Sequence, residues 1–481
     1  MAVLANKQWT GELIQMKLYI DTDEVYITDS LGVYDDNGTL TSLIESVSFS
    51  KSDGNTNVNP LGVASSDSIG LKIYDINDAL SPANITGQYA GKLTNGLKVE
   101  INKSSDGGQT WNPYGVYYTN SFSGSYSNGY HDLVSISASD RLNILGNTPV
   151  PELPVYANVT IKELIVALFT ALGYTEDEYY IDPKLNFNIL WGVLPGTKVR
   201  DFFNSVCQRT FARVTVNSTG VVRFIPALQL ATEYNTLTVG PTDIGTLKNS
   251  NSNNINYSKV NVKYDVYGTT ADATVLSRDG VSLALGHNEI SDIQFSNTVV
   301  CIKNVYIRYK SELSLAKIEN VEYQAYQRAM VLSLDVLNAN VFEVSIRVDA
   351  VVLTTIEKTA SVSLDTGIRS GLTEYTLDTN NQMTDEEAQQ LCNDIVEYIK
   401  TLENTIEISG TILTPDLSIG DEVIIENTGT MYDGVYKVTK LQVEFGQSYS
   451  LGATLLRVES SDNEGDSSDN EEDSTEDGTV E

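Results

Sequence analysis

Side chains able to do chemistry are few in this sequence and far apart. It has two histidines among 481 residues, His131 and His287, and both lie in stretches rich in strand-forming residues. A zinc site or a Ser/His/Asp triad needs a histidine beside other ligands or partners, and neither histidine has such neighbours in the sequence. Glycine-rich nucleotide-binding motifs, HExxH and CxxC do not occur. We therefore expect no catalytic residues, no metal site and no cofactor.

The three cysteines do not indicate a disulfide framework. Cys207, Cys301 and Cys392 are widely separated, and their odd number leaves at least one unpaired within the chain. Cys207 and Cys392 fall inside predicted helices, where cysteine ordinarily serves as a small buried apolar side chain.

Acidic residues are abundant but form no recognisable site. Among 64 acids, carboxylate pairs are unavoidable, so pairs alone do not indicate a glycosidase. The loop Asp35–Gly38 has side chains that could hold calcium, but its spacing does not match the EF-hand loop. We interpret it as a turn formed by Asp and Asn.

One short motif follows a known pattern. Residues 104–111 match S-x-D-x-G-x-T-W, the Asp-box, which is best known from the propeller blades of sialidases. The serine and aspartate can bond backbone groups in a hairpin turn, and the glycine tolerates a positive φ. Propellers repeat the motif in each blade, whereas here the one partial repeat is at 363–367, so we interpret it as a structural hairpin. A carbohydrate-binding or sialidase-like surface protein is the alternative. The motif residues are Ser104, Asp106, Gly108, Thr110 and Trp111.

The charge of the chain excludes some partners. The formal net charge is −33, and the last 23 residues, 459–481, hold 11 acids and no lysine or arginine. The rest has all 31 basic residues and 53 of the 64 acidic ones, so its charge is −22. Such a chain repels phosphate backbones and anionic membrane surfaces. We expect neither specific nucleic-acid binding nor stable membrane association.

Residues 9–150 read as short strands separated by polar loops. Alternation in Leu97–Ile101 and Val134–Ala138 implies strands with one buried face and one solvated face. Strands at this spacing suit a barrel or a sandwich. The predicted strands are Glu12–Ile20, Glu24–Thr28, Leu43–Ser50, Ser68–Tyr74, Leu97–Asn102, Val116–Phe122 and Leu133–Ala138.

A compact helix-bearing insert follows. Thr160 and Glu163 form a capping box at the start of one helix, and Gly173 stands where a left-handed residue ends it. A second helix is predicted from about 197 to 208. It leads into two strands, 211–216 and 221–225, which read as a β-hairpin.

The second half is again rich in strands, at 259–264, 299–309 and 341–353. One helix interrupts it, capped by Thr384 and Glu387, with an apolar stripe along one side. Four closing strands are predicted at Ile406–Leu413, Glu422–Glu426, Gly434–Val443 and Tyr449–Leu456. The acidic residues after Glu459 cannot bury enough apolar surface to order themselves.

Four segments in this order resemble a known family. They are Ser137–Leu145, Val221–Pro226, Lys259–Tyr264 and Pro415–Ile425. Over about Leu13 to Leu456, the chain resembles the phage tail hub (baseplate hub) proteins, which are related to the spike proteins of type VI secretion. The match rests on the order and spacing of these segments.

The resemblance implies a mainly β fold with α+β inserts and two β-barrel-like domains. It implies the first barrel in 1–150 with a return strand at about 221–228, and an α/β insert in 151–220. A second barrel is expected from 229–350 and 403–458, a helix-containing insert from 351–402, and a disordered acidic tail from 459–481. Many relatives append a peptidase or lysozyme-like domain that cuts cell walls, and we expect no wall-degrading role for this chain.

The resemblance also implies a function and partners. Three chains would form a ring of six barrels that joins a hexameric tail tube to a trimeric spike or fibre and lets DNA and a tape measure protein pass during ejection. The expected partners are thus the homotrimer, a distal tail or tail tube protein, a spike or fibre protein and the tape measure protein, in the virion. An acidic channel wall would keep DNA from adhering. A receptor-binding adhesin at the tail tip is a further alternative.

Two expectations complete this interpretation. Residues 1–9 lack the apolar core of a signal peptide, and no run of 18 apolar residues occurs, so we expect assembly in the host cytoplasm. Contacts between subunits are expected on strands near Leu43–Ser50, Val260–Tyr264 and Ile406–Leu413. The residues assigned to these contacts are Val47, Phe49, Val260, Val262, Ile406 and Ile408.

Overall fold

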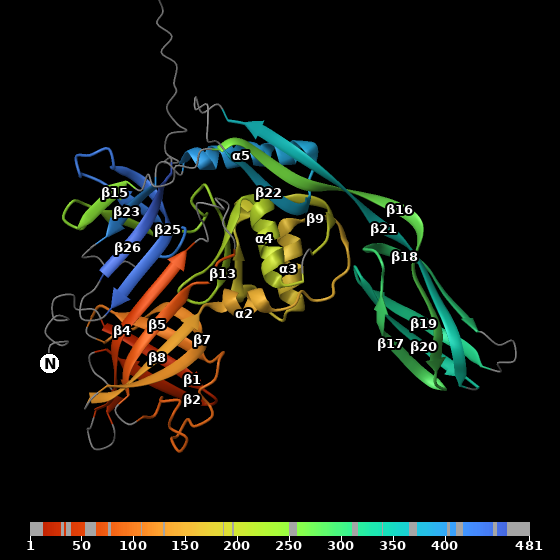
Figure 1. Cartoon of the computed structure of the whole chain (residues 1–481), viewed down its shortest axis with the longest axis horizontal. Coiled ribbons are helices and arrows are strands. Elements are labelled where there is room, and N and C mark those ends of the chain that lie inside the picture. The colour runs from red at the N-terminus through yellow and green to blue at the C-terminus, as the bar shows by residue number, and fades with distance from the viewer. Residues whose placement is uncertain are drawn as a thin grey trace, which may run out of the picture.

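A computed structural model gives the fold of most of the chain. It describes residues 13–29, 33–34, 40–52, 64–75, 78–106, 108–127, 130–185, 187–194, 197–249, 257–309, 316–338, 340–364, 373–401, 405–409, 417–445 and 450–458. The described chain is mainly β, as predicted, with helices gathered in the middle and at one end of a long arm (Figure 1). The acidic tail 459–481 and the loop Asp35–Gly38 lie outside the described residues.

One sheet of 14 strands unites the two ends of the chain. Its main path runs β15-β23-β26-β25-β4-β5-β8-β7-β6-β1-β2. The N-terminal strands are β1 (Leu13–Ile20), β2 (Asp23–Thr28), β3 (Val33–Tyr34), β4 (Leu40–Ser52), β5 (Ser68–Asp75), β6 (Lys98–Ser104), β7 (Asn112–Ser127) and β8 (Tyr130–Ser139). The later strands are β14 (Thr236–Val239), β15 (Thr246–Asn249), β23 (Thr405–Ser409), β24 (Glu422–Ile425), β25 (Gly434–Phe445) and β26 (Ser450–Arg457).

Strand β25 joins the two halves of this sheet. One edge of β25 pairs with β26, and the other pairs first with β24, up to Lys437, and then with β4, from Lys440. A register shift between Val438 and Lys440 lies where the partner changes, as expected for a bulge that bends a strand. The inward side chains of both halves form one apolar cluster that runs from Ile14 to Leu455. In Figure 1 the red and blue strands accordingly lie side by side.

A central module follows β8. Its helices are α2 (Arg141–Asn147), α3 (Ile161–Ala171) and α4 (Val199–Thr210), with short 3-10 turns η1 (Glu176–Glu178) and η2 (Pro183–Leu185). Its strands are β9 (Tyr156–Thr160), β10 (Tyr179–Ile181), β11 (Asn188–Gly192), β12 (Ala212–Val216) and β13 (Val222–Pro226). The predicted capping box of Thr160 and Glu163 is confirmed, Gly173 has φ +81°, and β12 and β13 form the predicted hairpin.

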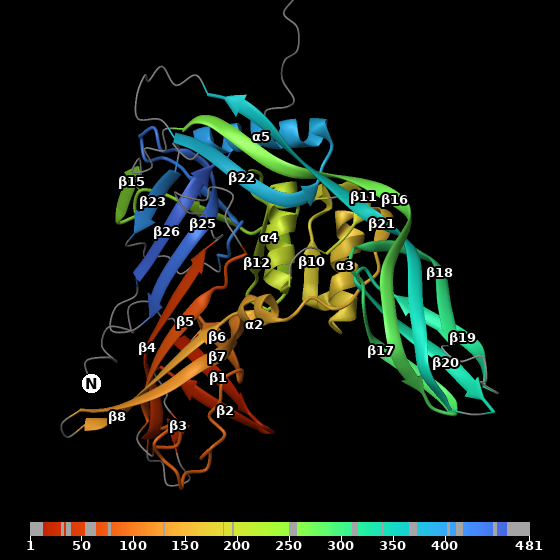
Figure 2. The same cartoon turned by 45° about the vertical axis from the view of Figure 1, so that its right-hand side comes forward.

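A long arm extends from the central module. Strands β16 (Tyr257–Leu283) and β21 (Val341–Ser363) run along its whole length, as Figure 2 shows. At the base, β22 (Thr373–Gln382) and α5 (Asp385–Thr401) pack around one apolar cluster. At the tip, β17 (Gly286–Gln294), β18 (Val299–Tyr309), β19 (Lys317–Ala325) and β20 (Ala329–Leu337) enclose another.

The residues predicted for the second barrel belong to two different apolar clusters. The ranges predicted for the second barrel, 229–350 and 403–458, contribute Val239, Ile406 and Val438 to the cluster of the large sheet. The same ranges contribute Val275 and Leu332 to the cluster of the arm tip. The domain boundaries given above stay a prediction.

Candidate functional site

The outward face of the large sheet is lined by serine across several neighbouring strands. Because side chains alternate along a strand, each inward Val, Ile or Leu is followed by an outward residue. On the middle strands this outward residue is repeatedly Ser, with Gly at two places. We name this surface the serine face; it comprises Ser46, Ser48, Ser50, Ser68, Gly70, Lys72, Ser121, Ser123, Ser135, Ser137, Ser139, Ser409, Gln442, Glu444, Ser450 and Gly452.

The pairing register places these residues in continuous rows across the sheet. One row is Ser450, Glu444, Ser48, Gly70, Ser137 and Ser121, and each is the direct partner of the next. The neighbouring row is Ser409, Gly452, Gln442, Ser50, Ser68 and Ser139. With neighbouring strands about 4.8 Å apart, each row spans roughly 24 Å. The serine face therefore crosses from the C-terminal strands into the N-terminal ones without a break.

The serine face is hollowed and nearly neutral. Two open hollows of about 610 Å³ and 270 Å³ lie on it. The charged residues that line them are one lysine, Lys72, and one glutamate, Glu444, so their charges cancel.

At the centre of this face, Gly70 lets a neighbouring side chain approach its backbone closely. The Ser48 hydroxyl donates to the Gly70 carbonyl on the adjacent strand, at 3.3 Å. A Cβ at Gly70 would lie 2.9 Å from Ser48 Oγ, so any side chain there displaces the serine. At Gly452, the nearest atom to such a Cβ is 3.9 Å away, so that position has room.

The other end of the same sheet, on β1, β2 and β6, has a different outward face. There Lys17 Nζ lies 4.6 Å from the ring centroid of Tyr19 and 5.4 Å from that of Tyr26, and Lys98 Nζ lies 5.0 Å from Tyr19. The Tyr19 hydroxyl donates to Glu100 and the Tyr26 hydroxyl to Glu24. We name these six residues the tyrosine–lysine ladder. The hydrogen bond from Tyr26, followed by that from Lys17, lowers the pKa of Glu24, and the hydrogen bonds to Tyr19 and Glu24 raise the pKa of Lys17.

A buried carboxylate pair lies where the central strands of the serine face end. Asp67 precedes Ser68, Asp140 follows Ser139, and both carboxyls are almost fully buried. Asp140 accepts from Ser66 Oγ at 2.6 Å, from Asp67 N at 2.9 Å and from Leu142 N at 3.0 Å, and so caps α2. Burial raises the pKa of Asp67 to about 8, and the nearby Asp140 adds to this. Burial also raises the pKa of Asp140, to about 6, but Asp140 accepts three hydrogen bonds where Asp67 accepts one, from Ser52 N at 3.2 Å. We infer that Asp140 loses its proton first and that Asp67 keeps its proton to higher pH.

Comparisons with known proteins find structural likeness only. No family model matches the sequence, and none of the curated proteins does. Solved structures similar to the chain include the 43 kDa tail protein of prophage MuSo2 from Shewanella oneidensis and a tail protein from Neisseria meningitidis. Each is 10% identical with a TM-score of 0.49; the matches cover 92% of this chain and 98% and 96% of those chains. The c3393 protein of E. coli, a component of the type VI secretion system, is 7% identical with a TM-score of 0.40, covering 86% of this chain and 74% of that one.

Phage tail proteins and type VI secretion proteins are thus both among the structural neighbours. These are the two groups that the sequence resemblance named. At TM-scores below 0.5, the neighbours do not establish the function of this chain, and the proposal made below rests on the surfaces of the chain itself.

The Asp-box residues form a closed turn between β6 and β7. Asp106 accepts from Ser104 Oγ at 2.7 Å, from Gln109 N at 2.9 Å, and from Thr110 N at 3.0 Å and Thr110 Oγ1. Ser104 Oγ in turn accepts from Gly108 N at 2.8 Å. These hydrogen bonds, that of the Thr110 hydroxyl first, lower the pKa of Asp106. The oxygens of the motif therefore point into its own turn. Trp111 follows directly, before β7 begins.

The residues predicted for subunit contacts lie inside the chain's own cores. Their strands β4, β16 and β23 each have a partner strand on both edges. Their role between subunits stays a prediction, and in this chain their side chains pack inward. The six are Val47, Phe49, Val260, Val262, Ile406 and Ile408, all at most 3% exposed.

The remaining candidate residues are scattered through the fold. His287 lies exposed on β17, where Nδ1 is 3.0 Å from Asp335 Oδ1, and His131 lies on β8. Cys207 and Cys392 are buried in α4 and α5, as predicted, and Cys301 is exposed on β18. In the described ranges no three His, Cys, Asp or Glu side chains gather as metal ligands would. None of the described helices is both long enough and apolar enough to cross a lipid bilayer.

Sequence reasoning missed the serine face, although its signal was present. Ser46, Ser48 and Ser50 alternate with Ile44, Val47 and Phe49 around a register shift, and Ser135, Ser137 and Ser139 alternate with buried residues. Threonine, not serine, is the hydroxyl residue that is enriched in strands. Its repetition on several strands was the available clue.

Proposed function

We propose that this chain is a structural hub protein of a phage tail tip or baseplate, and that its serine face forms part of the wall of a DNA-passage channel. The observation that carries this proposal is the serine face, which crosses the junction between N-terminal and C-terminal strands in unbroken rows. The structural neighbours include tail proteins, which agrees with this proposal without carrying it.

The chemistry of the serine face suits a surface along which a polyanion slides. Lysine or arginine on such a wall would bind phosphates and displace counterions, which holds nucleic acid in place. Hydroxyl groups stay hydrated and carry no charge, and short side chains lose little conformational freedom on contact. The sequence led us to expect an acidic wall. A wall with Lys72 and Glu444 in balance prevents adhesion without excluding the passenger.

The sheet also offers a way to build a ring. Its path ends at β15 and β2, and each of these strands has one partner among the described residues. Open sheet edges bind other strands readily, so assembly of copies would cover them. We propose a homotrimer in which each chain presents its N-terminal and C-terminal strand groups. Three chains would then match a hexameric tail tube on one side and a trimeric spike or fibre on the other. The tape measure protein and DNA would pass through the ring, with no catalytic role for the chain, in a virion assembled in the host cytoplasm.

Replacing serines of the face by lysine tests the channel role. In virions that carry Ser48→Lys, Ser50→Lys and Ser137→Lys together, we expect particles to assemble and adsorb but to release DNA at least tenfold more slowly. With three added phosphate contacts in each chain of the trimer, nine in all, DNA affinity of the purified assembly should fall by about 10⁵-fold between 50 and 200 mM salt. Ser277→Lys, at an exposed position of β16 on the arm, is the matched control. Equal slowing by the control, or normal release from the triple variant, would show that the face is not the channel wall.

The mass of the assembly in solution tests the ring. Light scattering on the purified chain should give three copies per particle, and images of virions should place it at the tail tip. A monomer that never enters virions contradicts the hub. The carbohydrate-binding alternative predicts binding on a glycan array, where the hub predicts none, and cell-binding assays separate an adhesin from a hub.

A further inference from the structure

The arm consists of two bodies with separate cores. The base core contains Tyr264, Leu377 and Ile395, contributed by β16, β22 and α5. The tip core contains Val275, Leu332 and Ile346, contributed by β16, β20 and β21. The two clusters share no residue among those described, so apolar packing does not join base to tip.

A two-stranded bridge connects them. The last pairing of β22 with β16 is at Asp265, and β18 first pairs with β21 at Val352. In between, β16 and β21 pair as strands only with each other in the described structure, and Leu353 N donates to the Thr298 carbonyl at 2.9 Å. Here Gly268 and Thr269 face Thr354 and Leu353, and Ile356 is 64% exposed. Isolated pairs of strands are marginally stable and twist readily.

The backbone of the bridge is also irregular on its tip side. The register shifts between Thr270 and Ala273, and Asp272 has φ +59°. A bulge of this kind bends a strand and weakens its pairing locally. The bridge therefore has the properties of a hinge.

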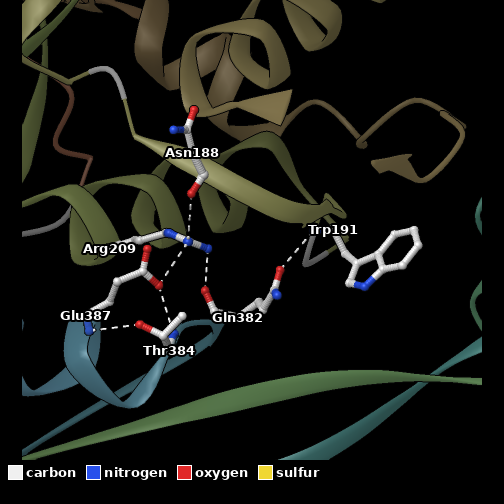
Figure 3. Close-up of polar contacts among 6 residues, drawn as sticks. All are labelled: Asn188, Trp191, Arg209, Gln382, Thr384 and Glu387. Carbon is white, nitrogen blue, oxygen red and sulfur yellow. Dashed lines mark hydrogen bonds and ion pairs between the residues drawn. The ribbon is translucent and has the colours of Figure 1, made fainter. Parts of the chain in front are cut away.

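The base is held firmly to the central module (Figure 3). The Arg209 guanidinium donates to the Gln382 carbonyl and, at 3.5 Å, to the Asn188 carbonyl, and it lies 3.6 Å from Glu387. Burial lowers the pKa of Arg209, whose side chain is 8% exposed. Gln382 Oε1 accepts from Trp191 N at 3.0 Å. These contacts hold the end of β22 in place, and none of them involves a residue of the tip.

In the described structure, Gln327 in the turn between β19 and β20 hydrogen-bonds the tip to the central module. Gln327 N donates to the Leu153 carbonyl at 2.8 Å. Its side chain accepts from Leu194 N at 3.4 Å and donates to the Leu194 carbonyl at 3.3 Å. The apolar clusters of tip and module share no described residue. These contacts are few for a body with a core of its own.

We propose that the arm tip is a hinged element: it swings about the two-stranded bridge, and Gln327 is the catch that holds it against the central module. Release leaves both cores intact because neither spans the bridge. It also uncovers the backbone groups of Leu153 and Leu194, which another chain can then occupy. The base, fixed by Arg209 and Gln382, stays in place. This inference goes beyond the proposed hub role and does not depend on it.

Distances between two labels on the full chain test the hinge. The exposed Cys301 on the tip takes one spin label, and Lys162→Cys, on the exposed side of α3, takes the other; Cys207 and Cys392 are buried. We expect one narrow distance distribution in the parent. Gln327→Ala removes both side-chain hydrogen bonds. In this variant we expect a second, longer distance whose population is at least threefold higher than any population at that distance in the parent. Amide exchange at Leu194 should accelerate by a similar factor.

Two controls separate a hinge from general loosening. Gln324→Ala removes an exposed glutamine of the same strand hairpin and should leave the distribution unchanged. Arg209→Met should alter exchange around Gln382 and Asn188 without producing the longer tip distance. An unchanged distribution in Gln327→Ala, or the same broadening in Gln324→Ala, overturns the hinge. Unchanged circular dichroism shows that Gln327→Ala still folds, and global unfolding of this variant would count against independent cores.

Discussion

The serine face and the tyrosine–lysine ladder lie on the same side of one sheet and place charge in opposite ways. On the ladder, charged side chains lie outside, where Lys17 and Lys98 cover tyrosine rings and the carboxylates of Glu24 and Glu100 accept hydrogen bonds from the tyrosine hydroxyls. Beneath the serine face, the carboxyls of Asp67 and Asp140 lie inside, buried at the strand ends. The face itself carries Lys72 and Glu444, whose charges cancel, so one sheet presents a charged outward surface at one end and a nearly neutral one in its middle.

The largest effect is expected from Asp140, because it serves the buried pair and α2 together. Asp140→Ala leaves the N–H groups of Asp67 and Leu142 without their acceptor. We expect a loss of about 2–4 kcal/mol in the free energy of unfolding, measured by urea denaturation. Asp23→Ala, exposed on β2 beside the ladder, should cost less than about 0.5 kcal/mol. Similar losses from both variants would remove the distinction between inside and outside charge.

The pH dependence of stability distinguishes the two regions next. The pKa of Asp67 is raised to about 8 in the folded chain from 3.8, so the folded state keeps a proton that the unfolded chain loses. Its stabilising contribution is complete below pH 3.8 and is lost as pH rises toward 8. Urea midpoints at pH 5 and pH 8.5 should show that Asp67→Asn gains stability over the parent at the higher pH, by about 1–3 kcal/mol. A parent that gains stability relative to Asp67→Asn as pH rises would contradict this assignment.

A smaller effect separates two glycines within the serine face. Gly70→Ala should destabilise by about 1 kcal/mol, since the added Cβ displaces Ser48 from its hydrogen bond to the next strand. Gly452→Ala, where there is room, should be neutral or stabilising by a few tenths of a kcal/mol, roughly the gain in β propensity. Thermal melting of both variants measures the difference. Equal losses of stability in the two variants would mean that the close approach of Ser48 to Gly70 does not matter for the sheet.

The smallest effect is expected on the ladder. Tyr26→Phe removes the hydroxyl that donates to Glu24 and leaves the ring under Lys17. The lost hydrogen bond is exposed and the ion pair of Lys17 with Glu24 remains, so we expect the free energy of unfolding to fall by less than about 0.5 kcal/mol, at low and high salt alike. Ser137→Ala, the matched hydroxyl removal on the serine face, should cost no more than this in the same urea denaturation.

Local patterns allowed much of the fold to be predicted. The capping box at Thr160, the hairpin from Ala212 to Pro226 and the helix after Thr384 follow from short-range hydrogen bonds and alternation, which the sequence displays directly. Helix α2 was not predicted: the predicted strand ends at Ala138, and no element was assigned to residues 140–145. Its seven residues depend on the Asp140 cap and on packing against α4, neither of which shows as a periodic pattern.

Long-range pairing explains what remained out of reach. The alternation of serine with apolar residues is local and can be seen in the sequence. The pairing of Phe49 with Val443 joins residues far apart in the chain and cannot be seen there. Without that pairing the serines of β4 and the residues of β25 have no common surface. The polar middle of β16, with Thr269, Thr270 and Asp272, likewise reads as a loop. It forms a strand because β21, which is distant in the sequence, pairs with it along the arm.

The partner change along β25 limits how such a chain can diverge. Because one strand sets the register of both strand groups, an insertion or deletion of one residue after Lys437 would turn Gln442 and Glu444 inward and expose Val443. The two ends of the gene therefore cannot be exchanged independently between related proteins. Recombination that preserves the fold must carry β1 to β8, β14, β15 and the last four strands together, whereas the arm tip, with a core of its own, can be replaced.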